Sequence, residues 1–393
     1  MSSSRTAIVV GRGVAGMVGA LALANSGIGV TLVGRAATEP GRTVALFAPV
    51  LQFLSELGVW KAIRARAAPL RVLRVIDETG SIFSWRPLTF DAREIGLEAF
   101  GWNIAADELS ALLGEIVEGA PGIEVVEGFA SEPLFAEQRA SILVDGRGRV
   151  EAALIVGADG QHSLLRRSAG IVARVEKLPQ CALTATLAHE IPHEDASTEF
   201  QARGGPCTLV PLAGSMSSLV WMAPRAEAER LAALSDDAFA EAVELRVHSI
   251  LGKMRVAGAR AVFPLSSVEV ERFVGTRLAL VGEAAHAFAP IGAQGLNLGL
   301  RDVESLARRL ERTLALGGDI GAPRVLEDYD RARRFDIASR SAAVGMMNNS
   351  LLSAFWPFDL GRGASMAALD LVGPLRRFVM REGLAPGFGR SPS

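Results

Sequence analysis

Three glycine-rich segments contain the residue types that could bind a phosphorylated or flat cofactor. They read "GRGVAG" from Gly11, "GADG" from Gly157 and "GEAAHAFAPIGAQGLNLGLRD" from Gly282. Each follows a short apolar run that is typical of a buried strand. Glycine permits close backbone approach, and a helix that begins just after such a turn presents unpaired N–H groups to a phosphate. The spacing therefore predicts nucleotide binding, whereas no catalytic triad, carboxylate pair or metal-ligand set stands out in the sequence.

The first segment fits the full pattern of strand, G-x-G-x-x-G, helix and strand. Gly11 would make the tight turn, Gly13 would let the backbone reach a pyrophosphate, and Gly16 would let the helix pack close to the sheet. An acidic residue usually ends the second strand and holds the ribose hydroxyls. Gly34 stands there instead, followed by Arg35. If the missing acid limits affinity, Gly34→Glu should tighten cofactor binding by about 1–2 kcal/mol.

Composition narrows the class of protein. Of the 393 residues, 49% are hydrophobic and 21% charged, and the formal net charge of -2 gives no case for nucleic-acid binding. Cys181 and Cys207 are the only cysteines, which excludes a cysteine-only zinc site and suggests a reducing compartment. A signal peptide or membrane span competes for the apolar N-terminus, but the density of glycines favours the strand–turn–helix interpretation. We therefore expect a cytoplasmic protein.

A second pattern occupies residues 70–100 and 178–276. "ALTATLAHEIP" alternates as a half-buried strand should, "PCTLVPLAGSMSSLVWMAP" predicts a hairpin, and "ARAVFPLSSVEVERFVG" predicts another extended run. These strands would form a mostly antiparallel sheet inserted between parts of the nucleotide-binding unit. On this sheet, Thr208, Val210, Trp221 and Phe263 could face a substrate, although packing within the sheet is the commoner role for such residues.

The three motifs together resemble the FAD-dependent aromatic hydroxylases, the flavoprotein monooxygenases of the p-hydroxybenzoate hydroxylase type. The resemblance spans nearly the whole chain and is closest to the ubiquinone-biosynthesis hydroxylases. Its most specific parts are "GADGQHSLLR" and "PIGAQGLNLGLRD". It implies an α/β fold with a Rossmann-like FAD domain of the glutathione reductase type, an interleaved antiparallel substrate sheet and C-terminal helices. We expect the FAD domain in residues 1–69, 101–177 and 277–330, the substrate domain in 70–100 and 178–276, and the helical region in 331–393.

The resemblance also implies roles for individual positions. The loop that includes the third motif would lie against the flavin, and the helix after it would aim its N-terminus at the flavin N1 and C2 carbonyl. His286 in this loop could act at the flavin or make a structural hydrogen bond. No catalytic side chain and no metal ligand is assigned. The implied cofactor-binding residues are Gly11, Gly13, Val14, Ala15, Gly16 and Arg35 at the pyrophosphate end, Arg42, Asp159, Gly160, Gly282 and Glu283 along the cofactor, and Pro290, Gly292, Ala293, Gln294, Gly295, Leu296 and Asn297 around the ring.

The implied activity is hydroxylation of an aromatic ring. Reduced flavin would react with O2 to a hydroperoxide that passes one oxygen atom to the ring. FAD is the expected cofactor, NAD(P)H or an electron-transfer partner the reductant, and a polyprenyl phenol of ubiquinone biosynthesis the substrate. A hydroxylase of a small soluble phenol is one alternative. Another is a weakly flavin-binding scaffold protein of a biosynthetic complex, which Gly34, Ala106 and Ala293 favour because the family usually has other residues there.

The C-terminal region suggests a surface for partners. Residues 344–393 carry a heavy apolar load, and Arg376, Arg377 and Arg381 stand among Leu375 and Phe378. Apolar surface with cationic edges suits peripheral contact with an anionic membrane interface, here the inner face of the cytoplasmic membrane. Packing on the cofactor domain or on a second copy in a homodimer explains the same pattern equally well.

Overall fold

The computed structural model describes residues 5–36, 41–80, 86–287, 294–352 and 367–384. Its central sheet has six strands in the order β19-β20-β12-β1-β2-β8, and all neighbours except β19 and β20 run parallel. The strands are apolar along their length because both faces of such a sheet are covered. They span Thr6–Val10 (β1), Gly29–Val33 (β2), Ile123–Val126 (β8), Leu154–Gly157 (β12), Val274–Gly275 (β19) and Leu278–Leu280 (β20).

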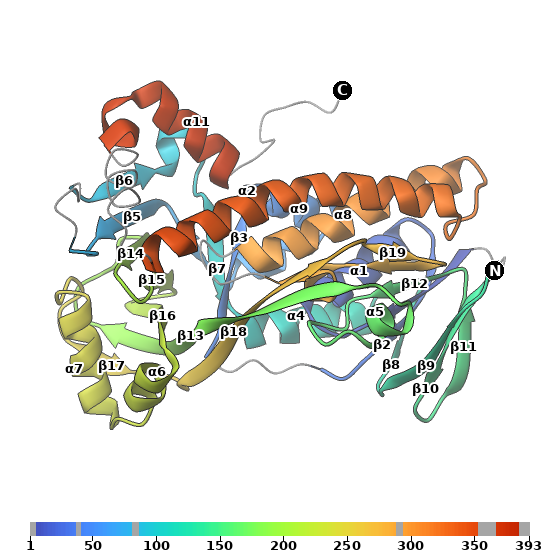
Figure 1. Ribbon diagram of the computed structural model, residues 1–393, viewed down its shortest axis with the longest axis horizontal. Coiled ribbons are helices and arrows are strands. Elements are labelled where there is room, and N and C mark those ends of the chain that lie inside the picture. Colours follow the sequence, from blue (N-terminus) through green and yellow to red (C-terminus); the bar gives the residue numbers. More distant parts are fainter. Residues whose placement is uncertain (1–4, 37–40, 81–85, 288–293, 353–366, 385–393) are drawn as a thin grey trace.

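Helix α1 (Val14–Asn25) accounts for the apolar N-terminus. All residues from Gly16 to Leu23 are buried, because α1 lies between the sheet, α4 (Ala106–Glu118) and α8 (Gln294–Ala315). A helix that is apolar on every side belongs in the core of a large protein or in a membrane. The structure therefore confirms the strand–turn–helix interpretation of this stretch. Figure 1 shows α9 (Pro323–Leu352) running alongside α8 over this half of the molecule.

Two small antiparallel sheets flank the central one. The sheet β3-β7-β4 joins Thr43–Phe47 (β3), Gly101–Ala105 (β7) and Ala68–Leu70 (β4), and the sheet β11-β10-β9 joins Gly148–Ala152, Ala140–Val144 and Ala130–Phe135. Three short helices complete this half, and they span Ala48–Glu56 (α2), Trp60–Arg64 (α3) and Leu164–Ser168 (α5). The β3 sheet is important for the site because it lies between α8 and the large second sheet.

The second sheet has nine strands, in the order β21-β18-β13-β16-β15-β14-β5-β6, with β17 also paired to β13. Only β14 and β5 pair in parallel, and the predicted hairpin is confirmed as β15 and β16. Helices α6 (Arg225–Ala232) and α7 (Asp236–Arg246) cover one face. The strands span Val72–Asp77 (β5), Leu88–Asp91 (β6), Ala173–His189 (β13), Ala196–Gln201 (β14), Cys207–Leu212 (β15), Met216–Pro224 (β16), Met254–Val256 (β17), Ala261–Val270 (β18) and His286–Ala287 (β21).

The long strand β13 differs from its prediction. Its alternating sequence predicted one solvated face, yet every residue from Gln180 to Ala185 is buried. Leu183 and Ala185 pack under α6 and α7. Ala182 and Thr184 lie on the opposite face, toward the half of the molecule that contains the central sheet and the predicted cofactor-binding motifs (the cofactor half). The small residues of this alternating sequence therefore lie where the second sheet meets the cofactor half.

Beyond α9, the described chain ends in α11 (Gly373–Leu384). Met380 anchors α11 in a small cluster with Ala92, Leu97 and Phe100, near the short helix η2 (Ala92–Ile95) and β6. Among the described residues, no helix is long and apolar enough to span a bilayer.

Candidate cofactor site and active site

The three glycines of the first motif have three different surroundings. A Cβ atom at Gly11, where φ is +116°, would lie 2.0 Å from the carbonyl oxygen of Ala158, and one at Gly16 would lie 1.8 Å from the carbonyl oxygen of Gly11. At Gly13 a Cβ atom would meet nothing within 4 Å among the described residues, apart from the chain neighbours of Gly13. Gly13 is also the N-cap of α1 and offers no side-chain cap to the first N–H groups. The turn thus leaves open space at a helix N-terminus, which is the arrangement that receives a pyrophosphate.

Gly34 closes the other side of this turn. A Cβ atom at Gly34 would lie 2.8 Å from the backbone nitrogen of Arg12 and 3.4 Å from the carbonyl carbon of Gly11. Both neighbours are backbone atoms of the glycine turn that begins at Gly11 (the cradle), so they cannot move aside as a flexible side chain could. The missing acid therefore reflects a lack of space. Arg35 beside it is exposed, and its guanidinium lies 4.1 Å from the centroid of the Phe129 ring.

The structure reverses the expectation for Gly34→Glu. We predict that this substitution lowers FAD affinity about tenfold or more, because overpacking at a backbone contact typically costs about 1–3 kcal/mol. Titration of the flavin-free protein with FAD, followed by flavin fluorescence, measures the change. Gly34→Ala should show most of the same loss, since the clash begins at Cβ. A variant with glutamate that binds FAD more tightly than the wild type would restore the original expectation.

The second motif supplies a buried acceptor beside the cradle. Asp159 accepts a hydrogen bond from the backbone N–H of Leu165 through Oδ2, at 3.2 Å, and Gly160 has a φ of +77°. The other oxygen, Oδ1, is buried and has no hydrogen-bond donor among the described residues. Buried carboxylate oxygens are normally satisfied, so this atom suits a hydroxyl or N–H of a bound cofactor. The orphaned oxygen and the open cradle at Gly13 both fit a dinucleotide.

Arg166, which the sequence analysis did not single out, joins the second motif to the third. It is buried and donates to the carbonyl oxygen of Ala284 at 2.7 Å and to that of Gln161 at 2.6 Å. The only indication in the sequence was the position of this arginine, two helical turns after Asp159. Its partner Ala284 lies 118 residues away in the chain, so the contact could not be predicted.

The small residues of the third motif serve backbone packing where the structure describes them. A Cβ atom at Gly299 would lie 3.0 Å from the Cα of Gly282, and one at Gly282 would lie 3.3 Å from the Cβ of Ala15. Helix α8 therefore approaches the segment after β20 at backbone contact, and that segment in turn packs against Ala15 of α1. The side chain of Glu283 is exposed, and Gly295 has open space at its Cβ position. Pro290, Gly292, Ala293 and the side chain of Gln294 lie outside what the structure describes.

Asn297 fixes the start of α8 to the β3 sheet. Its side chain is buried, accepts a hydrogen bond from the Phe47 N–H at 2.8 Å and donates one to the carbonyl oxygen of Ala45 at 2.7 Å. The amide thus holds strand and helix together. Leu296 packs against the main core. Contact of these residues with the flavin stays a prediction.

Asp302 organises the region behind the third motif. It is 0% exposed; Oδ2 accepts from the Gly282 N–H at 2.9 Å and lies 2.6 Å from Nε2 of His286, while Oδ1 accepts from Nε of Arg333 at 2.6 Å. Burial tends to raise the pKa of Asp302, but the charges of His286 and Arg333 outweigh it and hold that pKa below its ordinary value. Of the two roles considered for His286, this contact with Asp302 corresponds to the structural hydrogen bond.

The loop before β3 brings a cation to the second sheet. The Arg42 guanidinium lies 5.3 Å from the centroid of the Phe263 ring, and Thr43 shares a hydrogen bond of 2.9 Å with Ser218. A Cβ atom at Gly41, where φ is +75°, would lie 2.7 Å from the carbonyl oxygen of Ala259, so only glycine lets the loop come this close. Arg42 therefore stands where the cofactor half meets the second sheet.

The four candidate substrate residues divide between the two faces of the second sheet. Val210 packs against Ala45, Phe47 and Leu70 of the β3 sheet, and Phe263 meets Arg42. Thr208 lies two residues before Val210 on β15 and therefore shares its face. Trp221 pairs with Cys207 and Leu183 across the ladder and packs in the cluster under α6 and α7. Three candidates thus share the face toward the cofactor half, with Phe263 on β18 three strands away from Thr208 and Val210 on β15, and Trp221 points the other way.

Glu199 was missed by the sequence analysis. It pairs directly with Thr208 in the ladder and is half-buried. Burial raises the pKa of the Glu199 carboxyl above its ordinary value, although hydrogen bonds from Gln201 and Thr208 act in the opposite direction. Perturbed carboxyls in such positions are candidates for function. The sequence signal was an acid within the otherwise uncharged strand "ASTEFQ".

The comparisons with known proteins decide the family. A family model described as "FAD binding domain" matches residues 4–341. The chain belongs to this FAD-binding family. Among its relatives, ubiquinone hydroxylase UbiL of Rhodospirillum rubrum is 32% identical, covering 96% of this chain and 89% of the relative. The 3-demethoxyubiquinol 3-hydroxylase of Escherichia coli is 28% identical over 96% of this chain and 97% of its own length.

Solved structures of other proteins share the fold. The p-nitrophenol 4-monooxygenase PnpA of Pseudomonas putida superposes with a TM-score of 0.76 at 20% identity, covering 97% of both chains. HpxO of Klebsiella pneumoniae, solved with FAD, has a TM-score of 0.73 at 17% identity and covers 97% of this chain and 98% of its own. The predicted fold class and the FAD cofactor are therefore confirmed. The chain is an FAD-dependent oxidoreductase of the aromatic hydroxylase type.

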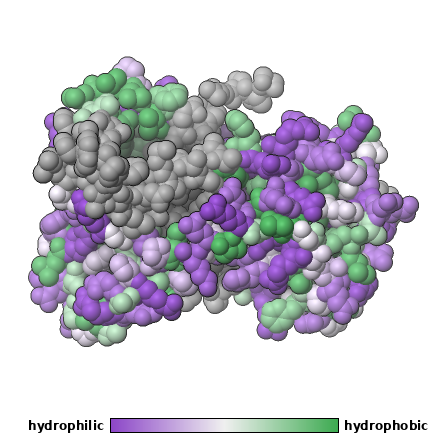
Figure 2. Space-filling model, in the orientation of Figure 1, coloured by the Kyte–Doolittle hydropathy of each residue, from purple (hydrophilic) through white to green (hydrophobic). Residues whose placement is uncertain are grey.

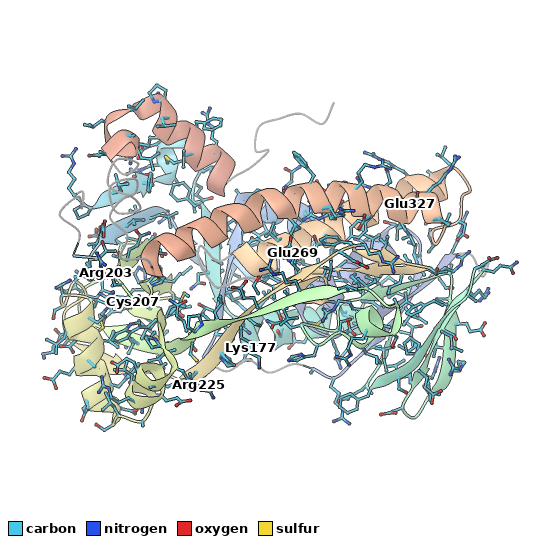
Figure 3. The ribbon with its side chains drawn as sticks, in the orientation of Figure 1. Lys177, Arg203, Cys207, Arg225, Glu269 and Glu327 are labelled. Atoms are coloured by element: carbon cyan, nitrogen blue, oxygen red, sulfur yellow. The ribbon has the colours of Figure 1, made fainter. Side chains whose placement is uncertain are left out.

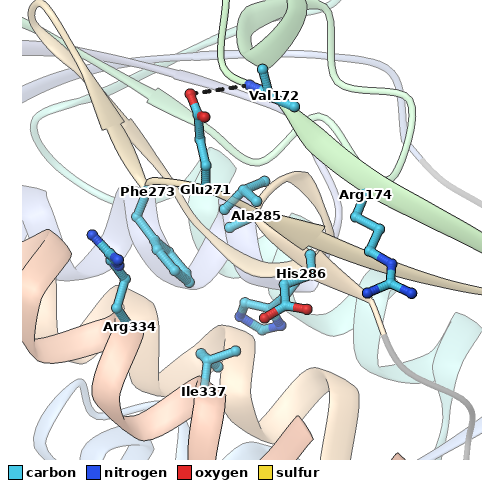
Figure 4. A pocket seen from close by; sticks show the side chains of 10 residues that line it. Val172, Arg174, Glu271, Phe273, Ala285, His286, Arg334 and Ile337 are labelled. Atoms are coloured by element: carbon cyan, nitrogen blue, oxygen red, sulfur yellow. Dashed lines mark hydrogen bonds between the residues drawn. The ribbon is translucent and has the colours of Figure 1, made fainter.

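Three further features of this FAD-binding protein concern a cavity, a cysteine and metal binding. A cavity of about 390 Å³ opens between β13, β18 and α9, with Phe273, His286 and Ile337 among its lining residues and charged side chains such as Arg174 and Arg334 around them (Figure 4). Cys207 lies inside the second sheet (Figure 3), and burial raises the pKa of its thiol to about 12. Among the described residues, no cluster could hold a metal ion.

Proposed function

We propose that the protein hydroxylates a polyprenyl phenol in ubiquinone biosynthesis. The observation that carries this proposal is near full-length similarity to UbiL at 32% identity, supported by a second relative whose name is also that of a ubiquinol-pathway hydroxylase. The reductant is NAD(P)H or an electron-transfer partner. The open cradle at Gly13 supports FAD binding, and near full-length similarity to named hydroxylases favours catalysis over the alternative of a weakly flavin-binding scaffold.

The chain's own residues divide the work as follows. Gly11, Gly13 and the N-terminus of α1 would hold the pyrophosphate, Asp159 would accept from a cofactor hydroxyl, and Arg42 would lie near the flavin end. When bound, reduced FAD supplies activation of O2 and transfer of one oxygen atom, while the other leaves as water. The apolar side chains that meet between the β3 sheet and β15 would exclude water from the ring.

One experiment tests the proposed function directly. The purified protein should be yellow and release FAD on denaturation. With a reductant and isotopically labelled O2, it should insert one labelled oxygen atom into a short-chain prenyl phenol, and mass spectrometry detects the product. An equal or greater rate on a phenol without the prenyl chain would support the small-phenol alternative. Absence of bound flavin after reconstitution would support the scaffold alternative.

We also propose that α11 contacts an anionic membrane surface, where a lipid-tailed phenol is found. Leu371, just before α11, is 68% exposed, and Phe378 within α11 is 62% exposed, while Met380 on the opposite side of the helix is buried. Figure 2 shows an apolar patch where Figure 1 places α11. Arg377 and Arg381 are exposed beside it. Arg376 is not part of this surface, because its guanidinium bonds Glu94 at 2.7 Å.

The test of this contact is flotation with anionic liposomes at low salt. Arg377→Glu combined with Arg381→Glu should weaken binding by at least about 1 kcal/mol per reversed charge, and salt should weaken the wild type in the same way. Arg312→Glu combined with Arg324→Glu, in α8 and α9, changes the net charge equally and should leave flotation unchanged. A wild-type protein that stays in the soluble fraction would remove the membrane proposal.

A further inference from the structure

A row of three polar residues and one valine crosses the second sheet on the face toward the cofactor half. Glu199 of β14 pairs with Thr208 of β15, Thr208 with Val220 of β16, and Val220 with Thr184 of β13. Residues directly opposite each other in a ladder point to the same face. Thr184 is 5% exposed, and its hydroxyl has no hydrogen-bond partner among the described residues. The row therefore runs from a carboxyl to a buried hydroxyl that lacks a described partner.

Contacts connect this row to the start of α8. The Asn297 side chain, at the start of α8, accepts a hydrogen bond from the backbone N–H of Phe47. The side chain of Phe47 packs in one cluster with Val210. Val210 lies two residues from Thr208 on the same strand, or about 7 Å along it. The opposite face of these strands is filled by the cluster under α6 and α7. A ring held between the start of α8 and β15 would consequently meet the Glu199–Thr208 end of the row.

The charge of Glu199 has no counterion in the described part of the chain. The carboxyl accepts from Nε2 of Gln201 at 3.2 Å and from Thr208, and no lysine, arginine or histidine described here forms an ion pair with it. Arg42 lies over Phe263 of β18, four strands from β14, which is about 19 Å at about 4.8 Å per strand. Arg246 lies over Phe200 and Trp221, on the other face.

We propose that Glu199 determines specificity: its carboxylate accepts a hydrogen bond from the phenolic hydroxyl of an uncharged ring and rejects a ring that bears a carboxylate. This inference rests on the proposed function and assigns a residue to its substrate choice. Two like charges in a desolvated site repel strongly, and no cation is at hand to offset them. A neutral phenol, in contrast, offers the hydroxyl donor that a carboxylate needs.

Binding to the FAD-loaded protein tests the assignment without catalysis. Dissociation constants for a prenyl phenol and the matching hydroxybenzoate are measured by equilibrium dialysis in mildly alkaline buffer. The wild type should prefer the phenol roughly 100-fold. Glu199→Gln should improve hydroxybenzoate binding roughly tenfold or more and change phenol binding much less, because the amide oxygen still accepts. Glu176→Gln, an exposed position on β13, is the matched control and should change neither.

The outcomes separate this inference from the proposed function. If the wild type binds both rings equally, Glu199 does not select and the inference fails, while the hydroxylase proposal stands. The same conclusion follows if Glu199→Gln keeps the wild-type ratio. If the wild type binds neither ring, the proposed function fails and the inference with it. The wild-type ratio needs no variant, so poor folding of Glu199→Gln leaves the test intact.

Discussion

Replacing Gly13 with valine is expected to abolish FAD binding while the protein stays folded. Among the described residues, nothing beyond the chain neighbours of Gly13 lies within 4 Å of the added Cβ, so we expect the side chain to extend into the space left for the pyrophosphate. We expect FAD affinity to fall more than about 100-fold, which corresponds to about 3 kcal/mol. Fluorescence titration of the flavin-free protein measures the affinity, and circular dichroism reports the fold. Thermal stabilisation by added FAD should also disappear, because it depends on binding.

Gly16 provides the matched control for this prediction. Alanine at Gly16 would place its Cβ 1.8 Å from the carbonyl oxygen of Gly11, so the first cost falls on the fold. Gly16→Ala should therefore lower the melting temperature of the flavin-free protein, whereas Gly13→Val should leave it nearly unchanged. A folded Gly13→Val protein with wild-type FAD affinity would show that the cofactor binds elsewhere.

Local pattern was enough to predict the cradle and the hairpin. The positions of Gly11, Gly13 and Gly16 follow from a motif only six residues long, whose mechanics depend on neighbouring backbone. The β15–β16 pair follows from two apolar runs around a glycine turn. Near full-length resemblance added the cofactor and the reaction class, which no periodicity could supply.

Features that depend on distant partners were not predictable in this way. The lack of space at Gly34 becomes visible only when Arg12 is placed against it. Trp221 and Thr208 lie on opposite faces because register decides orientation, and a shift of one residue would exchange them. The surroundings of Glu199 are formed by β15 and β5, the two strands that pair with its own strand β14. The sequence predicted strands of the second sheet but could not predict which of their side chains share a face.

Removal of the Asp302 carboxylate should be the most damaging change to stability. Asp302→Ala would leave the buried guanidinium of Arg333 without the oxygen that lies 2.6 Å from its Nε, and would remove the acceptor of His286 and of the Gly282 N–H. Breaking a buried pair on one side typically costs about 3–5 kcal/mol. Urea unfolding of the flavin-free protein measures the loss. Asp328→Ala, which removes an exposed partner of Arg331, should cost less than about 1 kcal/mol.

The same carboxylate predicts how stability depends on pH. The pKa of Asp302 is held below its ordinary value in the folded protein, so its contribution is complete at neutral pH and is lost as the pH falls through that lowered pKa. The wild type should therefore lose more stability than Asp302→Ala between neutral and acidic pH. Replacing both partners, with Asp302→Leu and Arg333→Met, should recover part of the loss because no charge is left buried alone. Parallel pH profiles for wild type and Asp302→Ala would mean that this carboxylate does not hold the third motif in place.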